Sequence, residues 1–286
     1  MYNKKIHREV QSVLFSLLSE IDNENYVVEE EIKSRLLNAK YIIYNKIEEI
    51  DKKYLKRLNK LDLILANGMT QILVEKNVSK NKYEMRAICF IKENCDKDTM
   101  NMTILHELIH ILSTQTTVEK YINKLTVKQG FEEIVFTTDK EGICIGSYIN
   151  KDYEFLNEAY TQFYARKLYE KIYKKEFPKN KDAYYARTKI ISIFEIIDAN
   201  PNNFKDFINS NIANEKKIFY DGIIDLIKTI EDGYNVRLIR KETVYKSVID
   251  NLEKILVKEI DRRKNRSPEN KAKIKALVSN LLSKYK

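Results

Sequence analysis

Residues 103–112 read TILHELIHIL, where two histidines stand four positions apart around a glutamate. On an α-helix this spacing is about one turn, so His106 and His110 can aim their imidazoles at a common point. Two neutral imidazoles supply half of the tetrahedral ligand set that zinc takes in proteins. Glu107 lies one step round the helix, where it can take a proton from a metal-bound water and pass it to a leaving amine. The spacing indicates a hydrolytic zinc site.

The residues around this motif favour a metal. Ile104, Leu105, Ile111 and Leu112 make the helix apolar nearly all round. Two imidazoles and a carboxylate are costly to bury without a partner, and a metal ion is such a partner. Only three histidines occur in the chain, which makes a chance HExxH match rare. The alternative is a pair of hydrogen-bonded histidines in the core of a helical protein.

A catalytic zinc site of this kind needs a third protein ligand and one position for water. The remaining histidine, His7, is remote in the chain, so a carboxylate or a thiolate is expected. Glu158 stands in FLNEAYTQFYA, on a separate predicted helix 48 residues after His110. An ordinary surface carboxylate is the alternative for this residue taken alone. Cys89 and Cys144 are rival ligands, but each falls inside a predicted strand without a partner at ligand spacing, which is typical of small buried side chains.

HELIH followed by LNEAYTQ resembles the gluzincin metallopeptidases, the thermolysin-like class with HExxH and a glutamate ligand on a later helix. The resemblance covers roughly residues 86–165, little more than a quarter of the chain. It implies a zincin-like fold, a peptide or protein substrate, and one zinc ion. It also implies that the ion is bound by His106, His110 and Glu158, with Glu107 as the general base and acid.

Two further roles follow from the same resemblance. The class often has an aspartate four residues after the glutamate ligand, orienting a ligand histidine; this chain has Gln162 there, and Asn157 or Thr161 could share the role. Gluzincins also use a tyrosine or histidine to stabilise the oxyanion. Tyr153 and Tyr148 lie just before the helix of the third ligand, where the resemblance places such a tyrosine. Packing in the core or on the surface is the alternative for both.

Around the motif the sequence predicts an α+β fold, mostly helical, with a small mixed β-sheet beside the HExxH helix. Six glycines and three prolines are few, and favour long helices. Asp98 or Thr99 should cap the HExxH helix, and Ser267 with Pro268 should begin a last helix. Apolar spacing predicts further helices over about 5–65, near 117–128 and over about 153–175. Strands are expected as about three in 61–93, with an Asn-Gly turn at 67–68, and as a hairpin near 131–137 and 142–149.

The chain divides into three expected regions. Pro178 marks the clearest boundary, and the first helices should pack on the common core because no linker separates them. The strand near 86–92 is expected to offer a free edge to an extended peptide. The regions are an N-terminal helical region at 1–60, a zincin-like catalytic region at 61–176 and a C-terminal helical region with a basic tail at 177–286.

The net charge of +9 is concentrated at one end: from Lys254 to Lys286 there are eleven Lys/Arg against three Asp/Glu. Such a tail could bind nucleic acid or an acidic partner, but without a nucleic-acid motif a solvated helix face is favoured. No secretory signal and no membrane span of about 18 apolar residues is recognisable. Three cysteines cannot all pair within one chain. We expect a cytoplasmic protein, with leaderless export left open.

Three functions remain as hypotheses. The leading one is a zinc-dependent peptidase that hydrolyses peptide bonds through a metal-activated water, with Glu107 as base. The second is a zinc-stabilised, non-catalytic binding or regulatory protein that uses its basic helical C-terminus. The third is a structural helical protein in which the HExxH motif is a coincidence.

Overall fold

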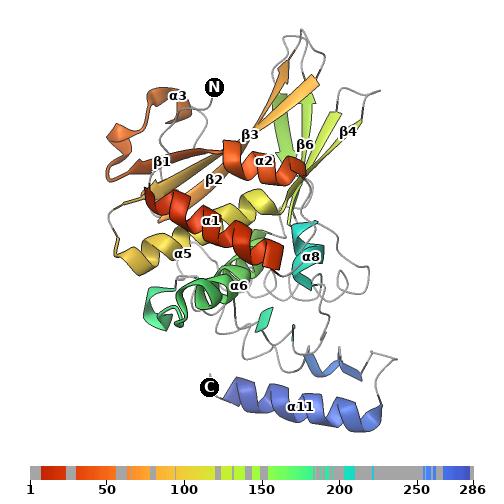
Figure 1. Ribbon diagram of the computed structural model, residues 1–286. Coiled ribbons are helices and arrows are strands. Elements are labelled where there is room, and N and C mark those ends of the chain that lie inside the picture. Colours follow the sequence, from red (N-terminus) through yellow and green to blue (C-terminus); the bar gives the residue numbers. More distant parts are fainter. Residues whose placement is uncertain are drawn as a thin grey trace, which may run out of the picture.

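The computed structural model describes residues 8–23, 30–55, 63–64, 66–77, 82–93, 95–119, 124–130, 132–138, 144–148, 154–182, 203–209 and 267–283, with scattered residues between 184 and 261. Helices combine with two small sheets in an α+β arrangement (Figure 1). The elements, with η for 3-10 helices, are α1 Arg8–Asn23, α2 Glu30–Asn38, β1 Lys40–Tyr44, η1 Ile47–Glu49, α3 Lys52–Leu55, β2 Gly68–Asn77, β3 Lys82–Lys92, α5 Lys97–Leu112, β4 Thr114–Glu119, β5 Lys124–Gln129, β6 Glu132–Thr138, β7 Cys144–Tyr148, α6 Glu154–Tyr173, η3 Lys179–Lys181, α8 Asn203–Ile208 and α11 Pro268–Ser283.

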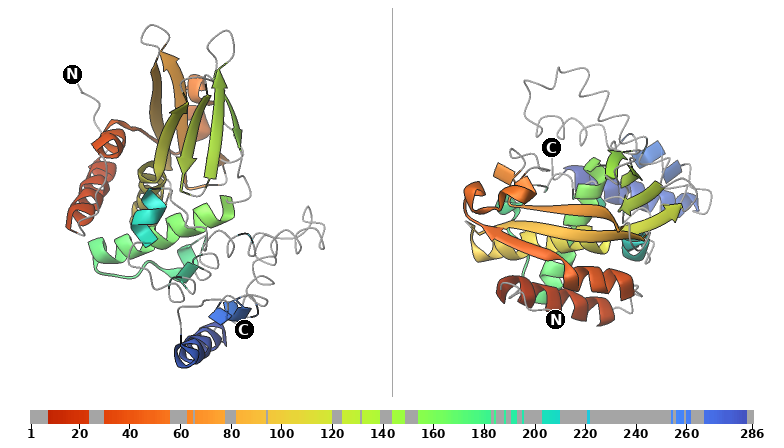
Figure 2. Two further views of the ribbon diagram at one scale, coloured as in Figure 1. Left: turned by 90° about the vertical axis from the view of Figure 1, so that its right-hand side faces the viewer. Right: turned by 90° about the horizontal axis from the view of Figure 1, so that it is seen from above.

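The two sheets stand side by side, and β2 approaches β7 where they meet (Figure 2). The first has the order β1-β3-β2, with β1 parallel and β2 antiparallel to the central strand. The second has the antiparallel order β4-β5-β6-β7. Helix α5 contacts β2 and β3 on one side, and α1, α2 and α6 elsewhere. The expected small mixed sheet beside the HExxH helix is confirmed.

Two expectations about the first sheet are wrong. Residues 40–44, which were expected to continue a helix through Ala39 and Ile43, form β1 and pair in parallel with 88–92. This strand therefore occupies one side of β3, so residues 88–92 offer no free edge to a peptide. Gly68 is the first residue of β2 rather than part of a hairpin turn. The competing β propensity of Tyr and Ile decides in favour of a strand once a partner strand is present.

One expectation about the region after α5 is also wrong. The helix expected near 117–128 is replaced by β4 and β5, which pair antiparallel with Val118 opposite Leu125. Short apolar runs fit helical and strand periods alike, and here the neighbouring β6 completes a sheet. The hairpin near 131–137 and 142–149 is confirmed as β6 and β7, and the helix over 153–175 as α6.

Two helix starts can be compared with the sequence. The N-cap of α5 is Asp96, two residues before the expected Asp98, and its side chain accepts hydrogen bonds from the backbone N–H groups of Asp98 and Thr99. At α11 the expectation is confirmed, because Ser267 Oγ accepts from the Asn270 N–H at 3.3 Å and Pro268 opens the helix.

The main core surrounds α5. All thirteen residues from Met100 to Leu112 are buried, as the apolar sequence predicted. Val10, Leu14 and Leu17 of α1 belong to the same cluster of buried residues, which confirms that the first helix shares this core. No helix among the described residues is both long and apolar enough to cross a bilayer.

Candidate metal centre

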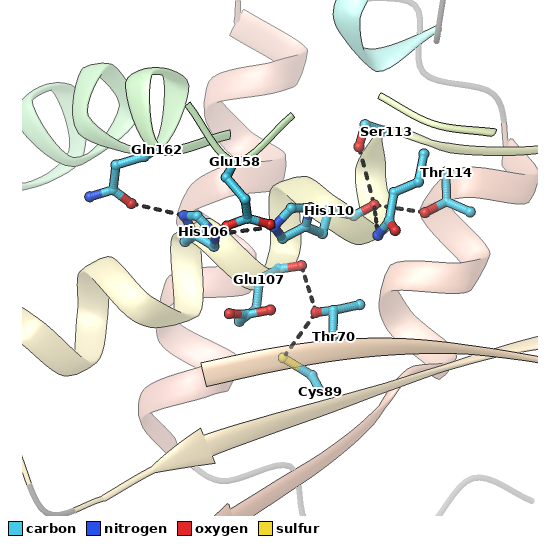
Figure 3. A network of polar contacts seen from close by, with 10 residues as sticks. Thr70, Cys89, His106, Glu107, His110, Ser113, Thr114, Glu158 and Gln162 are labelled. Atoms are coloured by element: carbon cyan, nitrogen blue, oxygen red, sulfur yellow. Dashed lines mark hydrogen bonds and ion pairs between the residues drawn. The ribbon is translucent and has the colours of Figure 1, made fainter. Parts of the chain in front are cut away.

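Helix α5 presents His106 and His110 to α6, which carries Glu158 (Figure 3). Side-chain hydrogen bonds to one backbone carbonyl restrain the last turn of α5. The His110 carbonyl accepts hydrogen bonds from Thr114 Oγ1 at 2.7 Å, Ser113 Oγ at 3.2 Å and Gln129 Nε2 at 3.2 Å. These side chains satisfy an acceptor that a helix end leaves open. They also fix the turn from which one imidazole projects.

The three side chains converge on one point. The two histidine Nε2 atoms are 3.0 Å apart, and each lies 3.2 Å from a different carboxylate oxygen of Glu158. Metal–ligand bonds of about 2.0–2.2 Å at tetrahedral angles separate neighbouring donors by about 3.4 Å. The observed separations are close to this value, so the donor set of His106, His110 and Glu158 fits a single metal ion.

Burial makes the site asymmetric. The side chains of His106 and His110 are 7% and 8% exposed, while that of Glu158 is 22% exposed. Glu158 is therefore the most exposed of the three side chains. Burial raises the pKa of the Glu158 carboxyl, but the adjacent imidazoles of His110 and His106 outweigh it, so this pKa lies well below its usual value. The carboxylate is thus held in the form that binds a cation.

Each ligand histidine must keep its metal-facing nitrogen unprotonated. For His106, the other ring nitrogen, Nδ1, lies 2.8 Å from Gln162 Oε1. Gln162 thus contacts the ligand histidine as the sequence suggested. Asn157 instead lies against Gly130. Thr161 Oγ1 is buried and has no hydrogen-bond partner among the described residues.

Glu107 lies on the sheet side of α5, opposite Glu158, with the two imidazoles between them (Figure 3). Its backbone carbonyl accepts a hydrogen bond from Thr70 Oγ1 of β2 at 3.2 Å. Its Oε2 is buried without a hydrogen-bond partner among the described residues. Burial raises the pKa of the Glu107 carboxyl, and the charges of His106 and His110 offset this only in part. A carboxylate with an open oxygen beside the donor set can accept a proton from a molecule bound there.

The remaining candidate residues from the sequence lie away from the donor set or outside the described residues. His7 and Tyr153 fall outside the described residues. Tyr148 is the last residue of β7, and its side chain is not among those described. The assignment of either tyrosine as oxyanion stabiliser stays a prediction. Cys89 is fully buried on β3, where burial raises its thiol pKa well above the usual value. It stands outside the donor set, and Cys144 belongs to β7.

Three residues of the site were missed in the sequence. Asp182 accepts a hydrogen bond from Gln162 Nε2 at 3.0 Å and another from Arg166 at 2.6 Å. Tyr184 stacks on the His106 ring, with ring centroids 5.4 Å apart and planes 8° from parallel. Arg166 follows Gln162 by four residues on a helix, which is a weak sequence signal. Nothing in the sequence links the other two to the motif, because they lie beyond the proline that ends this region.

No known protein family, curated protein or solved structure matches this chain. The chemistry of the centre is therefore inferred from its own residues.

Proposed function

We propose that this protein is a zinc-dependent metallopeptidase of the gluzincin type, with His106, His110 and Glu158 as ligands and Glu107 as general base. The observation that carries the proposal is the convergence of three donors at 3.0–3.2 Å beside a fourth group, a buried carboxylate that is not part of the donor set. The buried helix and the adjacent mixed sheet are consistent with a zincin-like catalytic region.

The donor types favour zinc. Calcium and magnesium prefer shells made of oxygen, whereas two imidazoles and one carboxylate suit zinc and leave one position open. The same donor types also suit ferrous iron in oxygenases. Glu107 favours hydrolysis over that alternative, because a proton acceptor beside the open position is the group that activation of water requires.

When bound, zinc would supply a water of lowered pKa and polarise the scissile carbonyl. Beside the donor set, Glu107 would serve as general base toward such a water and then as general acid toward the leaving amine. The core around α5 fixes the positions of His106 and His110, so the groups that they bind would keep their positions relative to Glu107. Either Tyr148 or Tyr153 would donate to the oxyanion, in keeping with the sequence prediction.

The strand that would pair with an extended peptide substrate is β2 rather than β3. Among the described strands, β2 lies at the edge of the first sheet, and its Thr70 contacts the backbone of Glu107. Although β7 approaches β2 where the sheets meet, the start of β2 at Gly68 lies beside Glu107, so an extended peptide pairing with the edge there would pass Glu107. The strand expected for this role, β3, has β1 on one side and β2 on the other.

The test is Glu107→Gln, which keeps the shape of the side chain but removes its basicity. Cleavage of a random peptide library should fall about 10²–10⁴-fold, while the zinc content measured by atomic emission stays at the parental level. His106→Ala is the matched control and should lose both zinc and cleavage. Parental cleavage by Glu107→Gln refutes the proposed base. Zinc binding without cleavage in the parent favours a zinc-stabilised binding protein instead.

A further inference from the structure

We propose that Asp182 is a positioning residue that acts through Gln162 to set the tautomer of His106, so that Nε2 is the nitrogen free to bind metal. The inference rests on the metal site of the proposed function and names a residue outside the HExxH helix and outside α6. It is carried by the hydrogen bonds that join three side chains into one relay.

Asp182 anchors the relay. Its side chain is fully buried, with 0% exposed, and is paired with Arg166 at 2.6 Å. Its other oxygen, Oδ1, accepts from Gln162 Nε2 at 3.0 Å and from the backbone N–H of Tyr184 at 2.9 Å. A carboxylate paired with a guanidinium accepts hydrogen bonds and donates none. Asp182 therefore requires the amide nitrogen of Gln162, not its oxygen, to face it.

The orientation of the Gln162 amide determines which of its atoms faces His106. With its nitrogen turned to Asp182, Gln162 presents its oxygen to His106 Nδ1, at 2.8 Å. An amide oxygen only accepts, so Nδ1 must carry the ring proton. A neutral imidazole has one N–H, which leaves the lone pair on Nε2. Nε2 is the atom that lies 3.0 Å from His110 Nε2 and 3.2 Å from Glu158.

The segment that contains Asp182 also restrains the ring. Tyr184, two residues further on, stacks on His106 with nearly parallel planes. Its backbone N–H binds the same carboxylate oxygen as the Gln162 amide does. One buried carboxylate thus sets both the edge contact and the face contact of a ligand histidine. A hydrogen-bond partner of this kind typically changes metal affinity by about 10–100-fold.

The first measurement needs no variant. In the metal-free protein labelled with ¹⁵N-histidine, at about pH 8.5, the neutral tautomer of the His106 ring should carry its proton on Nδ1. Its signals are identified by their loss in His106→Gln, among only three histidines in the chain. A proton on Nε2 of His106 in the parent overturns the proposal.

The second measurement reverses the relay. In Asp182→Asn the side-chain oxygen can stay with Arg166 while the amide N–H₂ takes the place of Oδ1. There it loses the hydrogen bond from the Tyr184 backbone N–H and donates to Gln162, which then turns its own nitrogen toward His106. The ring proton should move to Nε2, and zinc affinity measured by chelator competition should fall about 10–100-fold. Asp22→Asn, at a surface ion pair of α1 with Lys33, is the matched control and should change neither quantity.

Rescue separates positioning from folding. In the double variant Gln162→Glu/Asp182→Asn, the new glutamate accepts from both His106 Nδ1–H and the Asn amide. We expect the Nδ1–H tautomer to return, with at least about a tenfold recovery of zinc affinity over Asp182→Asn. A double variant that binds zinc no better than the single one, or a single variant with parental tautomer and affinity, overturns the relay. These readouts use zinc and imidazole signals alone, so they stand apart from whether peptides are cleaved.

Discussion

Gly68 of β2 lies directly against the Glu107 side chain. A Cβ atom at Gly68 would come within 2.7 Å of Glu107 Oε1 and within 2.5 Å of Thr103 Cγ2. Both distances are shorter than van der Waals contact allows, so the carboxylate and the glycine occupy adjoining space. The absence of a side chain at the start of β2 is what allows Glu107 to lie between the sheet and the histidines.

Gly68→Ala should therefore displace Glu107. A shift of about 1 Å in a catalytic group can cost about 10²-fold in rate, while the three metal ligands are untouched. We expect kcat to fall by that order with zinc content unchanged, measured by peptide cleavage and metal analysis. The usual effect of replacing a strand glycine by alanine is mildly favourable. Unchanged kcat would mean that Glu107 does not act from the position described.

Zinc should stabilise the folded protein, because the donor set is assembled only there. At zinc concentrations about 100 times Kd, binding to the folded state alone adds about 2.7 kcal/mol, which thermal unfolding should register as a rise in Tm of several degrees. Chelation should reverse the rise. Glu158→Gln should reduce it strongly, whereas Glu170→Gln, an exposed position on the same helix, should show the parental rise. Equal responses of the two variants would place the metal elsewhere.

The N-cap of α5 should contribute to stability. Asp96 accepts from the N–H groups of Asp98 and Thr99 at 3.1 and 3.3 Å, and from Lys181 Nζ at 2.9 Å. Asp96→Ala should lower the midpoint of urea unfolding, because the two N–H groups lose their acceptor. Asp98→Ala keeps the cap and removes an ion pair with Lys175 and a hydrogen bond with Tyr169, so its loss should be smaller. The reverse ranking would show that the cap is unimportant.

The same aspartates predict how stability depends on acid. A hydrogen bond from Lys181 lowers the pKa of Asp96, and one from Lys175 lowers that of Asp98. Since both pKa values are lower in the folded state than in the unfolded one, their stabilisation is complete above the ordinary aspartate pKa of about 3.9. It is lost as pH falls through the lower folded values. Between about pH 5 and pH 2, the Tm should fall more steeply with decreasing pH for the parent than for Asp96→Asn/Asp98→Asn. Equal slopes would show that these two carboxylates do not contribute to the acid dependence of stability.

Much of the candidate metal centre could be predicted from the spacing of residues that are close together in the sequence. His106 and His110 share a face because any helix brings residues four apart together, and the apolar residues around them made a buried helix the consistent interpretation. Glu158 could be selected because a partly buried carboxylate on a second helix is unusual. The assignments of α6 and the β6–β7 hairpin needed only periodicity, since each element is continuous in the chain.

The wrong secondary-structure predictions share one cause. Where a segment could form either a helix or a strand, the strand that pairs with it decides which one forms. Residues 40–44 are a strand because β3 lies beside them, 48 residues later in the chain. Residues 114–119 and 124–129 form β4 and β5 because they complete a sheet with β6. Local propensity for strand and helix differs by less than the free energy of such tertiary contacts.

What the amino-acid sequence indicated by itself is the set of candidate groups: two histidines and a glutamate that could bind a metal ion, a carboxylate between the histidines, and the helices that bear them. The tertiary structure decided which groups support this candidate set. Asp182 faces Gln162, and Gly68 faces Glu107, only because distant segments pack against α5 and α6. A side chain's type is local information, whereas its hydrogen-bond partner depends on the path of the whole chain.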